Sequence, residues 1–114
     1  MANFTKQLLS GSTNGRGIKV GATATPGTLV HTADSTATDE VWIYAMNTDS
    51  ASRTLTLEWG GTTDPDDLIE ITLGASPGLT LIVPGLPVDG GVVVRAFADS
   101  ADVVTVHGFV NRIE

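Results

Sequence analysis

The sequence predicts an all-β protein, a single-domain antiparallel β-sandwich of about eight or nine strands, and three observations support this. Short runs rich in valine, isoleucine and threonine recur at a spacing of roughly 8–12 residues, with glycine, proline and aspartate turn signals between them. No stretch shows the apolar period of about 3.6 residues that an amphipathic helix needs. The chain also holds 13 glycines and few good helix formers. Sandwiches, jelly rolls and barrels all give such spacing, and we favour a jelly-roll-like sandwich, although the spacing does not fix the strand order.

The first three predicted strands are short and are separated by glycine-rich turns. They span Phe4 to Leu9, Ile18 to Val20 and Thr28 to Thr32. Between the first two lies the turn from Gly11 to Gly17, whose glycines supply positive φ angles. The third run is expected at an edge or at the periphery of a sheet.

The segment from Glu40 to Asp67 is expected to form a long hairpin from two strand runs, Val41 to Asn47 and Arg53 to Trp59. The first run is apolar on both faces, because one side carries valine, isoleucine and alanine and the other side carries larger residues. Such a strand is either central in a layered fold or has one face against a partner chain. The larger residues are Trp42, Tyr44 and Met46.

The second run of this hairpin alternates between apolar and polar residues, which predicts one buried face and one solvated face. The inward set is Leu55, Leu57 and Trp59, and the outward set is Thr54, Thr56 and Glu58.

The remaining strands follow the same alternation. They are expected at Leu68 to Leu73, at Leu79 to Val83 where Pro84 and Gly85 end the run, at Val92 to Ala98, and at Val103 to Ile113. In the last strand the inner set is Val104, Val106, Gly108 and Val110. A glycine in mid-strand indicates a bulge or a close backbone approach.

Length and composition predict one domain over residues 1–114. The 114 residues are 41% hydrophobic and only 17% charged, which argues against disorder. The net charge is −7 and the basic residues are scattered singly, so we expect neither a nucleic-acid partner nor an anionic membrane partner. No apolar run approaches the roughly 20 residues of a membrane helix.

The chain contains no cysteine, so it has no disulfide and no thiolate zinc site. The first residues lack the basic start and the long apolar segment of a signal peptide. We therefore expect synthesis in a reducing cytoplasm without export.

No catalytic residue is predicted, and no cofactor. His31 and His107 lack a ligand-type partner at the i+2 or i+4 position, so each is expected to be a surface or interface imidazole. The cluster Asp64, Asp66 and Asp67 is a weak Ca²⁺ candidate, but it lacks the glycine and distal glutamate of an EF-hand, and a plain turn is the favoured interpretation.

The larger residues on the alternate face of the strands are candidates for an interface, where aromatic side chains are enriched. The alternatives are a second layer of core or, for the tryptophans and the tyrosine, a carbohydrate-stacking platform. The strand parity separates Trp59 from Trp42 and Tyr44 and so weakens the platform. The interface candidates are Trp42, Tyr44, Met46, Phe97 and Phe109.

The chain contains the runs Glu40-Val-Trp-Ile-Tyr-Ala-Met-Asn-Thr and Leu55-Thr-Leu-Glu-Trp-Gly-Gly-Thr-Thr-Asp-Pro-Asp-Asp. These runs and several others resemble segments of small all-β proteins encoded among the virion structural genes of tailed bacteriophages. Residues 8–20, 22–28, 92–97 and 108–113 carry the others, so the resemblance spans nearly the whole chain. The similarity lies in short runs of residues and not in a functional motif.

The resemblance implies a non-enzymatic structural virion protein, most like a head decoration (capsid cement) protein on the outer capsid surface. Its implied partners are the major capsid protein and further copies of itself, with a homotrimer favoured. A tail or fibre accessory protein that binds a receptor or a glycan is the alternative. An enzyme or a small-ligand lectin is a third hypothesis, which needs a concave site with convergent polar groups.

Overall fold

The computed structural model describes residues 3–75 and 78–114, and the regular elements of these residues are all strands. They form two antiparallel sheets packed face to face, which confirms the single-domain β-sandwich predicted from the sequence. The nine strands of the described residues are β1 (Phe4–Leu8), β2 (Ile18–Lys19), β3 (Thr28–Thr32), β4 (Thr38–Asn47), β5 (Arg53–Trp59), β6 (Leu68–Leu73), β7 (Thr80–Val88), β8 (Val93–Ala98) and β9 (Val104–Ile113).

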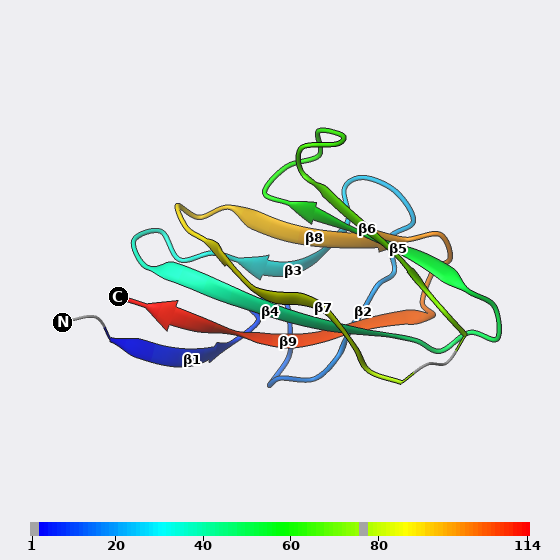
Figure 1. Ribbon diagram of the computed structural model, residues 1–114, viewed down its shortest axis with the longest axis horizontal. Helices are drawn as coiled ribbons and strands as arrows, with labels where there is room; N and C mark the ends of the chain where they lie inside the picture. The colour runs from blue at the N-terminus through cyan, green and yellow to red at the C-terminus, as the bar shows by residue number, and fades with distance from the viewer. Residues whose placement is uncertain (1–2, 76–77) are drawn as a thin grey trace.

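The first sheet has the strand order β1-β9-β4-β7, and the short β2 also pairs with β9 (Figure 1). The second sheet has the order β3-β8-β5-β6. The pairs β5·β6, β4·β7, β3·β8 and β2·β9 are nested around the β5–β6 turn, and all are antiparallel. From the innermost pair outward, β5·β6 and β3·β8 belong to the second sheet, whereas β4·β7 and β2·β9 belong to the first sheet. Successive nested pairs therefore alternate between the two sheets.

The predicted hairpin between residues 41–47 and 53–59 is wrong, because β4 and β5 lie in different sheets. The connection crosses from one layer to the other, and Asn47 at the end of β4 holds it in place. The buried Asn47 side-chain amide donates to the carbonyl oxygens of Ala51 in the connection (2.9 Å) and Leu73 in the second sheet (3.3 Å). The true partner of β5 in a hairpin is β6.

The core lies between the sheets and follows the predicted alternation. Val41, Ile43 and Ala45 of β4 are fully buried, and so are Leu55 and Leu57 of β5. Each fully buried valine, leucine or isoleucine contributes about 1.5–3 kcal/mol. In the last strand the predicted inner valines Val104, Val106 and Val110 are buried, and Gly108 is half-buried. Val94 and Ala96 of β8 are buried as well.

The outward face of β5 is not solvated, which corrects the expectation for Thr56 and Glu58. Their exposed fractions are 3% and 1%. The Glu58 carboxylate accepts a hydrogen bond from the Thr25 hydroxyl (2.5 Å) and one from the Gly27 main-chain N–H (2.6 Å). The segment before β3 therefore covers this part of the second sheet, and a buried acceptor holds it there.

Two prolines and a glycine do not end β7, contrary to the prediction that the strand stops at Val83. β7 is the edge strand of the first sheet, where a proline needs no ladder partner for its nitrogen. The register against β4 shifts twice, and Gly85, with φ +83°, falls between the paired residues Pro84 and Leu86. The bulge allows the strand to continue to Val88.

Candidate functional site

The outer face of the first sheet gathers four of the five residues predicted for an interface. Trp42, Tyr44 and Met46 project from β4, and Phe109 projects from the neighbouring β9. Trp42 and Phe109 are opposite each other in the ladder, and their rings stack with centroids 6.0 Å apart and planes 9° from parallel. We name these four residues the aromatic face.

The aromatic face is half-buried in the single chain and continues into exposed apolar side chains on both neighbouring strands. On β7, Leu81 is opposite Tyr44 and is 44% exposed. On β1, Leu8 is opposite Phe109 and is 56% exposed, and Phe4 is 70% exposed. Isolated apolar residues at a surface are ordinary, but apolar side chains that lie opposite one another on four neighbouring strands are typical of an interaction site.

Polar contacts fix the orientation of Trp42 within this face. Its indole N–H donates to Oε1 of Glu40 (2.7 Å), and the Asn111 amide donates to the same oxygen (3.1 Å). The hydrogen bonds from Trp42 and Asn111 lower the pKa of the Glu40 carboxyl. Glu40 is thus ionised at neutral pH and keeps the indole in one orientation.

The fifth interface candidate, Phe97, lies apart from the others. It belongs to β8 and therefore to the second sheet. Its parity is opposite to that of the buried Val94, Ala96 and Ala98, so it points away from the core on the other side of the molecule.

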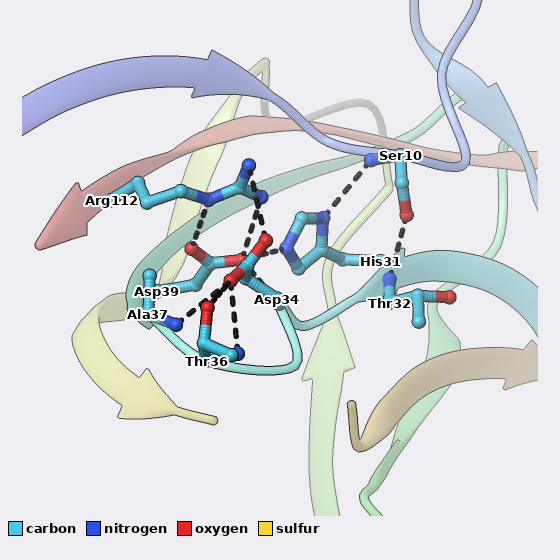
Figure 2. A network of polar contacts seen from close by, with 8 residues as sticks. All are labelled: Ser10, His31, Thr32, Asp34, Thr36, Ala37, Asp39 and Arg112. Atoms are coloured by element: carbon cyan, nitrogen blue, oxygen red, sulfur yellow. Dashed lines mark hydrogen bonds and ion pairs between the residues drawn. The ribbon is translucent and has the colours of Figure 1, made fainter. Parts of the chain in front are cut away.

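A buried polar network lies at the inner side of the first sheet (Figure 2). His31 of β3 and Asp39 of β4 are 1% and 0% exposed, and His31 Nε2 is 2.7 Å from Asp39 Oδ2. The guanidinium of Arg112 on β9 donates from Nε to Asp39 Oδ1 (2.8 Å) and from an Nη atom to Oδ2 (3.2 Å). The network thus joins a strand of the second sheet to two strands of the first.

The contacts of His31 determine its tautomer. The main-chain N–H of Ser10 donates to Nδ1 (3.0 Å), so Nδ1 is an acceptor and the ring proton lies on Nε2, from which it is donated to Asp39. Ser10 also accepts a hydrogen bond at Oγ from the Thr32 N–H (2.6 Å). Two hydrogen bonds therefore hold Ser10, which lies two residues after the end of β1, to β3.

The two arginine bonds and the imidazole bond determine the charge of Asp39. Burial pushes the pKa of the Asp39 carboxyl upward, but the hydrogen bonds from Arg112 and His31 outweigh it and hold this pKa below its ordinary value. The bond to Asp39 also raises the pKa of Arg112. Asp39 and Arg112 form a bidentate ion pair.

Asp34 completes the network from the turn between β3 and β4. Its carboxylate accepts from the main-chain N–H groups of Ala37 (2.8 Å) and Thr36 (3.0 Å), and these two bonds lower its pKa. The guanidinium of Arg112 lies 3.7 Å from Asp34. The turn is therefore closed by an ionised carboxylate that also faces the arginine.

The geometry of the network is that of a clamp between the sheets. Both nitrogens of His31 are engaged, one by Ser10 and one by Asp39, so no ring acceptor is left for the proton of a nucleophile. The Ser10 hydroxyl oxygen faces the β3 main chain. His31 is a buried residue of the fold, which corrects its assignment as a surface or interface imidazole.

His107 and the acidic loop occupy other places. His107 is half-buried on the outer face, opposite Tyr44, and its ring lies against Gly17. In the loop after β5, the Asp67 carboxylate accepts from the Thr63 N–H (3.2 Å), while Asp64 and Asp66 are exposed. Within residues 3–75 and 78–114, no group of three or more histidine, aspartate or glutamate side chains is arranged to hold a metal ion.

Sequence reasoning missed the network because its members are far apart in the chain. A signal was nevertheless present in the alternation of β4. Extending the inward series of Val41, Ile43 and Ala45 by one position at each end reaches Asp39 and Asn47, and both are fully buried. A polar residue at an inward strand position predicts a hydrogen-bonded partner in the core.

No family model, no curated protein and no solved structure matches this chain. In the described part of the chain no helix is long and apolar enough to cross a membrane.

Proposed function

We propose that this chain is a non-enzymatic structural protein of a tailed-bacteriophage virion that decorates the capsid and bridges capsid subunits. The aromatic face is the observation that carries the proposal. Trp42 is held by Glu40 and stacked on Phe109, so the face is ordered before any partner arrives. A partner that covers it gains apolar burial at a small cost in side-chain ordering.

The sandwich suits this role because its two layers have different surfaces. Aromatic and aliphatic side chains gather on the first sheet, while the outer side of β5 in the second sheet is covered by the chain's own segment around Gly27. One side of the molecule is thereby free to face a capsid. The nested strand pairs agree with a jelly roll, which we propose as the finer form of the fold.

A decoration protein works through many copies. Each copy buries a modest area across a joint between capsid subunits, and a homotrimer multiplies these contacts without requiring any of them to be tight. Synthesis in the host cytoplasm and a place on the outer capsid surface accompany this proposal. The resemblance of the sequence to phage virion proteins supports it as well.

Reconstitution tests the proposal. Purified protein is mixed with expanded heads that lack decoration, and binding is measured by sedimentation together with the temperature at which the heads break open. We expect saturable binding and heads that are more resistant to heat. Tyr44→Asp places a charge on the aromatic face and is expected to abolish binding. Phe97→Asp makes the same kind of change on the other sheet and is expected to bind normally.

The proposal is wrong if the wild-type protein does not bind heads, or if Phe97→Asp and Tyr44→Asp bind equally well. Binding to tails and not to heads would favour the second candidate, a tail or fibre accessory protein. The stacked Trp42 and Phe109 rings favour that candidate specifically, because sugars stack on aromatic side chains. A glycan array with Trp42→Ala as the control distinguishes glycan binding from binding to a protein surface.

A further inference from the structure

β1 is the least buried of the nine strands in the described residues. Its five residues include none that is buried, and Phe4 and Leu8 are exposed apolar side chains. Even Thr5, whose parity turns it toward the second sheet, is exposed, so β1 extends beyond the region that the second sheet covers. The strand is held by its ladder to β9 and forms one edge of its layer (Figure 1).

The free backbone groups of β1 lie on the side away from β9. Asn3 and Glu114 exchange two main-chain hydrogen bonds of 2.9 Å, which identifies them as a hydrogen-bonded pair. In an antiparallel ladder such pairs alternate, so Thr5 and Gln7 also bond to β9. The N–H and C=O groups of Phe4, Lys6 and Leu8 therefore point outward, where a further strand would pair with them.

The charge along this edge is positive, although the chain as a whole carries −7. Lys6 lies 4.6 Å above the centroid of the Phe109 ring. Arg16 and Lys19 line a surface hollow of about 350 Å³ at β2, which pairs with the part of β9 next to the part that β1 pairs with. Within the described residues none of these three cations has a carboxylate within ion-pair distance, whereas Arg53 and Arg112 are both paired.

From this edge we infer a docking site for an extended, acidic segment of a protein partner, added to the first sheet as a strand next to β1. The partner residue opposite Lys6 carries a carboxylate, and the residues opposite Phe4 and Leu8 are apolar, so the pattern is apolar-x-acidic-x-apolar. Side chains directly opposite in the ladder lie on the same face about 5.5 Å apart, close enough for Lys6 to pair with the carboxylate. The inference rests on the proposed function and specifies the chemistry of the capsid segment.

A second copy of this chain is a poorer occupant. Two β1 strands in full antiparallel overlap place Phe4 against Leu8 and Lys6 against Lys6 of the other copy. Like charges directly opposite each other destabilise a strand pair. The positive edge thus favours a partner strand with an acidic centre.

A peptide experiment tests the inference on the intact protein. The probe is the heptapeptide Ser-Val-Thr-Glu-Thr-Val-Ser with blocked ends, and its control has lysine in place of the central glutamate. Binding is followed by amide NMR shifts and by hydrogen exchange. We expect the amides of Phe4, Lys6 and Leu8 to gain protection, while those of Thr5 and Gln7 are protected already. The glutamate peptide should bind about tenfold more tightly than the lysine peptide.

Charge reversal supplies the matched variant. Lys6→Glu is expected to invert the preference, so that the lysine peptide binds more tightly than the glutamate peptide. Absence of any amide change at Phe4, Lys6 and Leu8 at millimolar peptide overturns the inference, and so does an unchanged preference in Lys6→Glu. Protection of the same three amides that grows with protein concentration alone also overturns it, in favour of pairing between copies. If the protein binds heads but does not bind the peptide, the proposed function stands and this inference fails. If the protein binds the peptide but does not bind heads, the docking site at β1 stands and the proposed function fails.

Discussion

His31 and Asp39 share a hydrogen bond of 2.7 Å between Nε2 and Oδ2 in the interior, and this bond joins the two sheets. The imidazole comes from the second sheet and the carboxylate from the first. Since both groups are almost completely buried, neither has water as a substitute partner. A buried polar contact of this kind is costly to disrupt from one side, because the remaining group keeps its desolvation penalty.

Replacing His31 by alanine is expected to destabilise the protein by about 2–4 kcal/mol. The change leaves the Ser10 N–H and one lone pair of Asp39 without partners, and it opens a cavity. Urea unfolding followed by tryptophan fluorescence measures the loss. His107→Ala is the matched control on the outer face, where water replaces the ring, and should cost less than about 1 kcal/mol. An equal loss of stability in the two variants would contradict the role of the His31–Asp39 contact in holding the sheets together.

The stability of the protein should fall in acid, in part through Asp39. An aspartate of the unfolded chain titrates near 3.8, and in the folded protein the pKa of Asp39 is lower. Protons therefore bind the unfolded chain more readily, so the stabilisation is fully present well above 3.8 and is lost as the pH falls through the folded pKa.

Asp39→Asn tests this pH dependence. At pH 7 the variant should be less stable than the wild type by about 1–3 kcal/mol, because the bonds from Arg112 lose their charged acceptor. The difference should shrink as the pH falls below about 4, because Asp39 of the unfolded wild-type chain binds a proton there while the folded carboxylate resists it. Urea midpoints measured between pH 2.5 and 7 give both curves. A difference that stays constant across this range would show that Asp39 is not an ionised partner.

The strands themselves could be predicted from the sequence because alternation is a local property. The bounds of β3, β5 and β6 agree with the predicted ones, and the valines predicted at the inner positions of β9 are buried. Pairing is not local. The turn after Asn47 looks like a hairpin turn in the sequence, yet the chain crosses to the other sheet there, since hydrogen bonds to Ala51 and Leu73 hold the connection.

The aromatic face could be predicted in part from the sequence, whereas the buried contacts among His31, Asp39 and Arg112 could not. Trp42, Tyr44 and Met46 share a face by parity alone, but only the β4–β9 register brings Phe109 onto Trp42, and only the sheet assignment separates Phe97. Arg112 is 73 residues from Asp39 in the sequence, so no motif spacing could indicate their contact.

Thr25→Val should destabilise the protein through Glu58. Among the described residues the buried carboxylate would keep the Gly27 N–H as its one hydrogen-bond donor, at an expected cost of about 1–3 kcal/mol. Hydrogen exchange should also show faster opening at the N–H of Gly27. Thr23→Val, at an exposed position of the same segment, is the control and should be close to neutral. The covering role of the segment would be refuted if both variants unfolded at the same urea concentration.

Gly108→Ala should cost about 1–3 kcal/mol, because a Cβ at this position would collide with the carbonyl oxygen of Trp42 on the adjacent strand. This close approach accounts for the glycine in mid-strand, as the sequence predicted. Gly74→Ala provides the control, since a Cβ there meets no atom within 4 Å. Thermal unfolding of the two variants side by side measures the effect, and a Gly108 variant as stable as the Gly74 variant would rule out the collision.

Leu57→Asp and Tyr44→Asp separate the core from the proposed interface. Leu57 is fully buried between the sheets, so an aspartate there is an unpaired buried charge that costs several kcal/mol and should prevent folding. Tyr44 is half-buried on the outer face, where water can solvate the new carboxylate. We therefore expect Tyr44→Asp to remain folded, with a wild-type circular dichroism spectrum and cooperative unfolding, and to lose self-association in light scattering as well as binding to heads. Collapse of the fold in Tyr44→Asp would instead identify the aromatic face as a second layer of core.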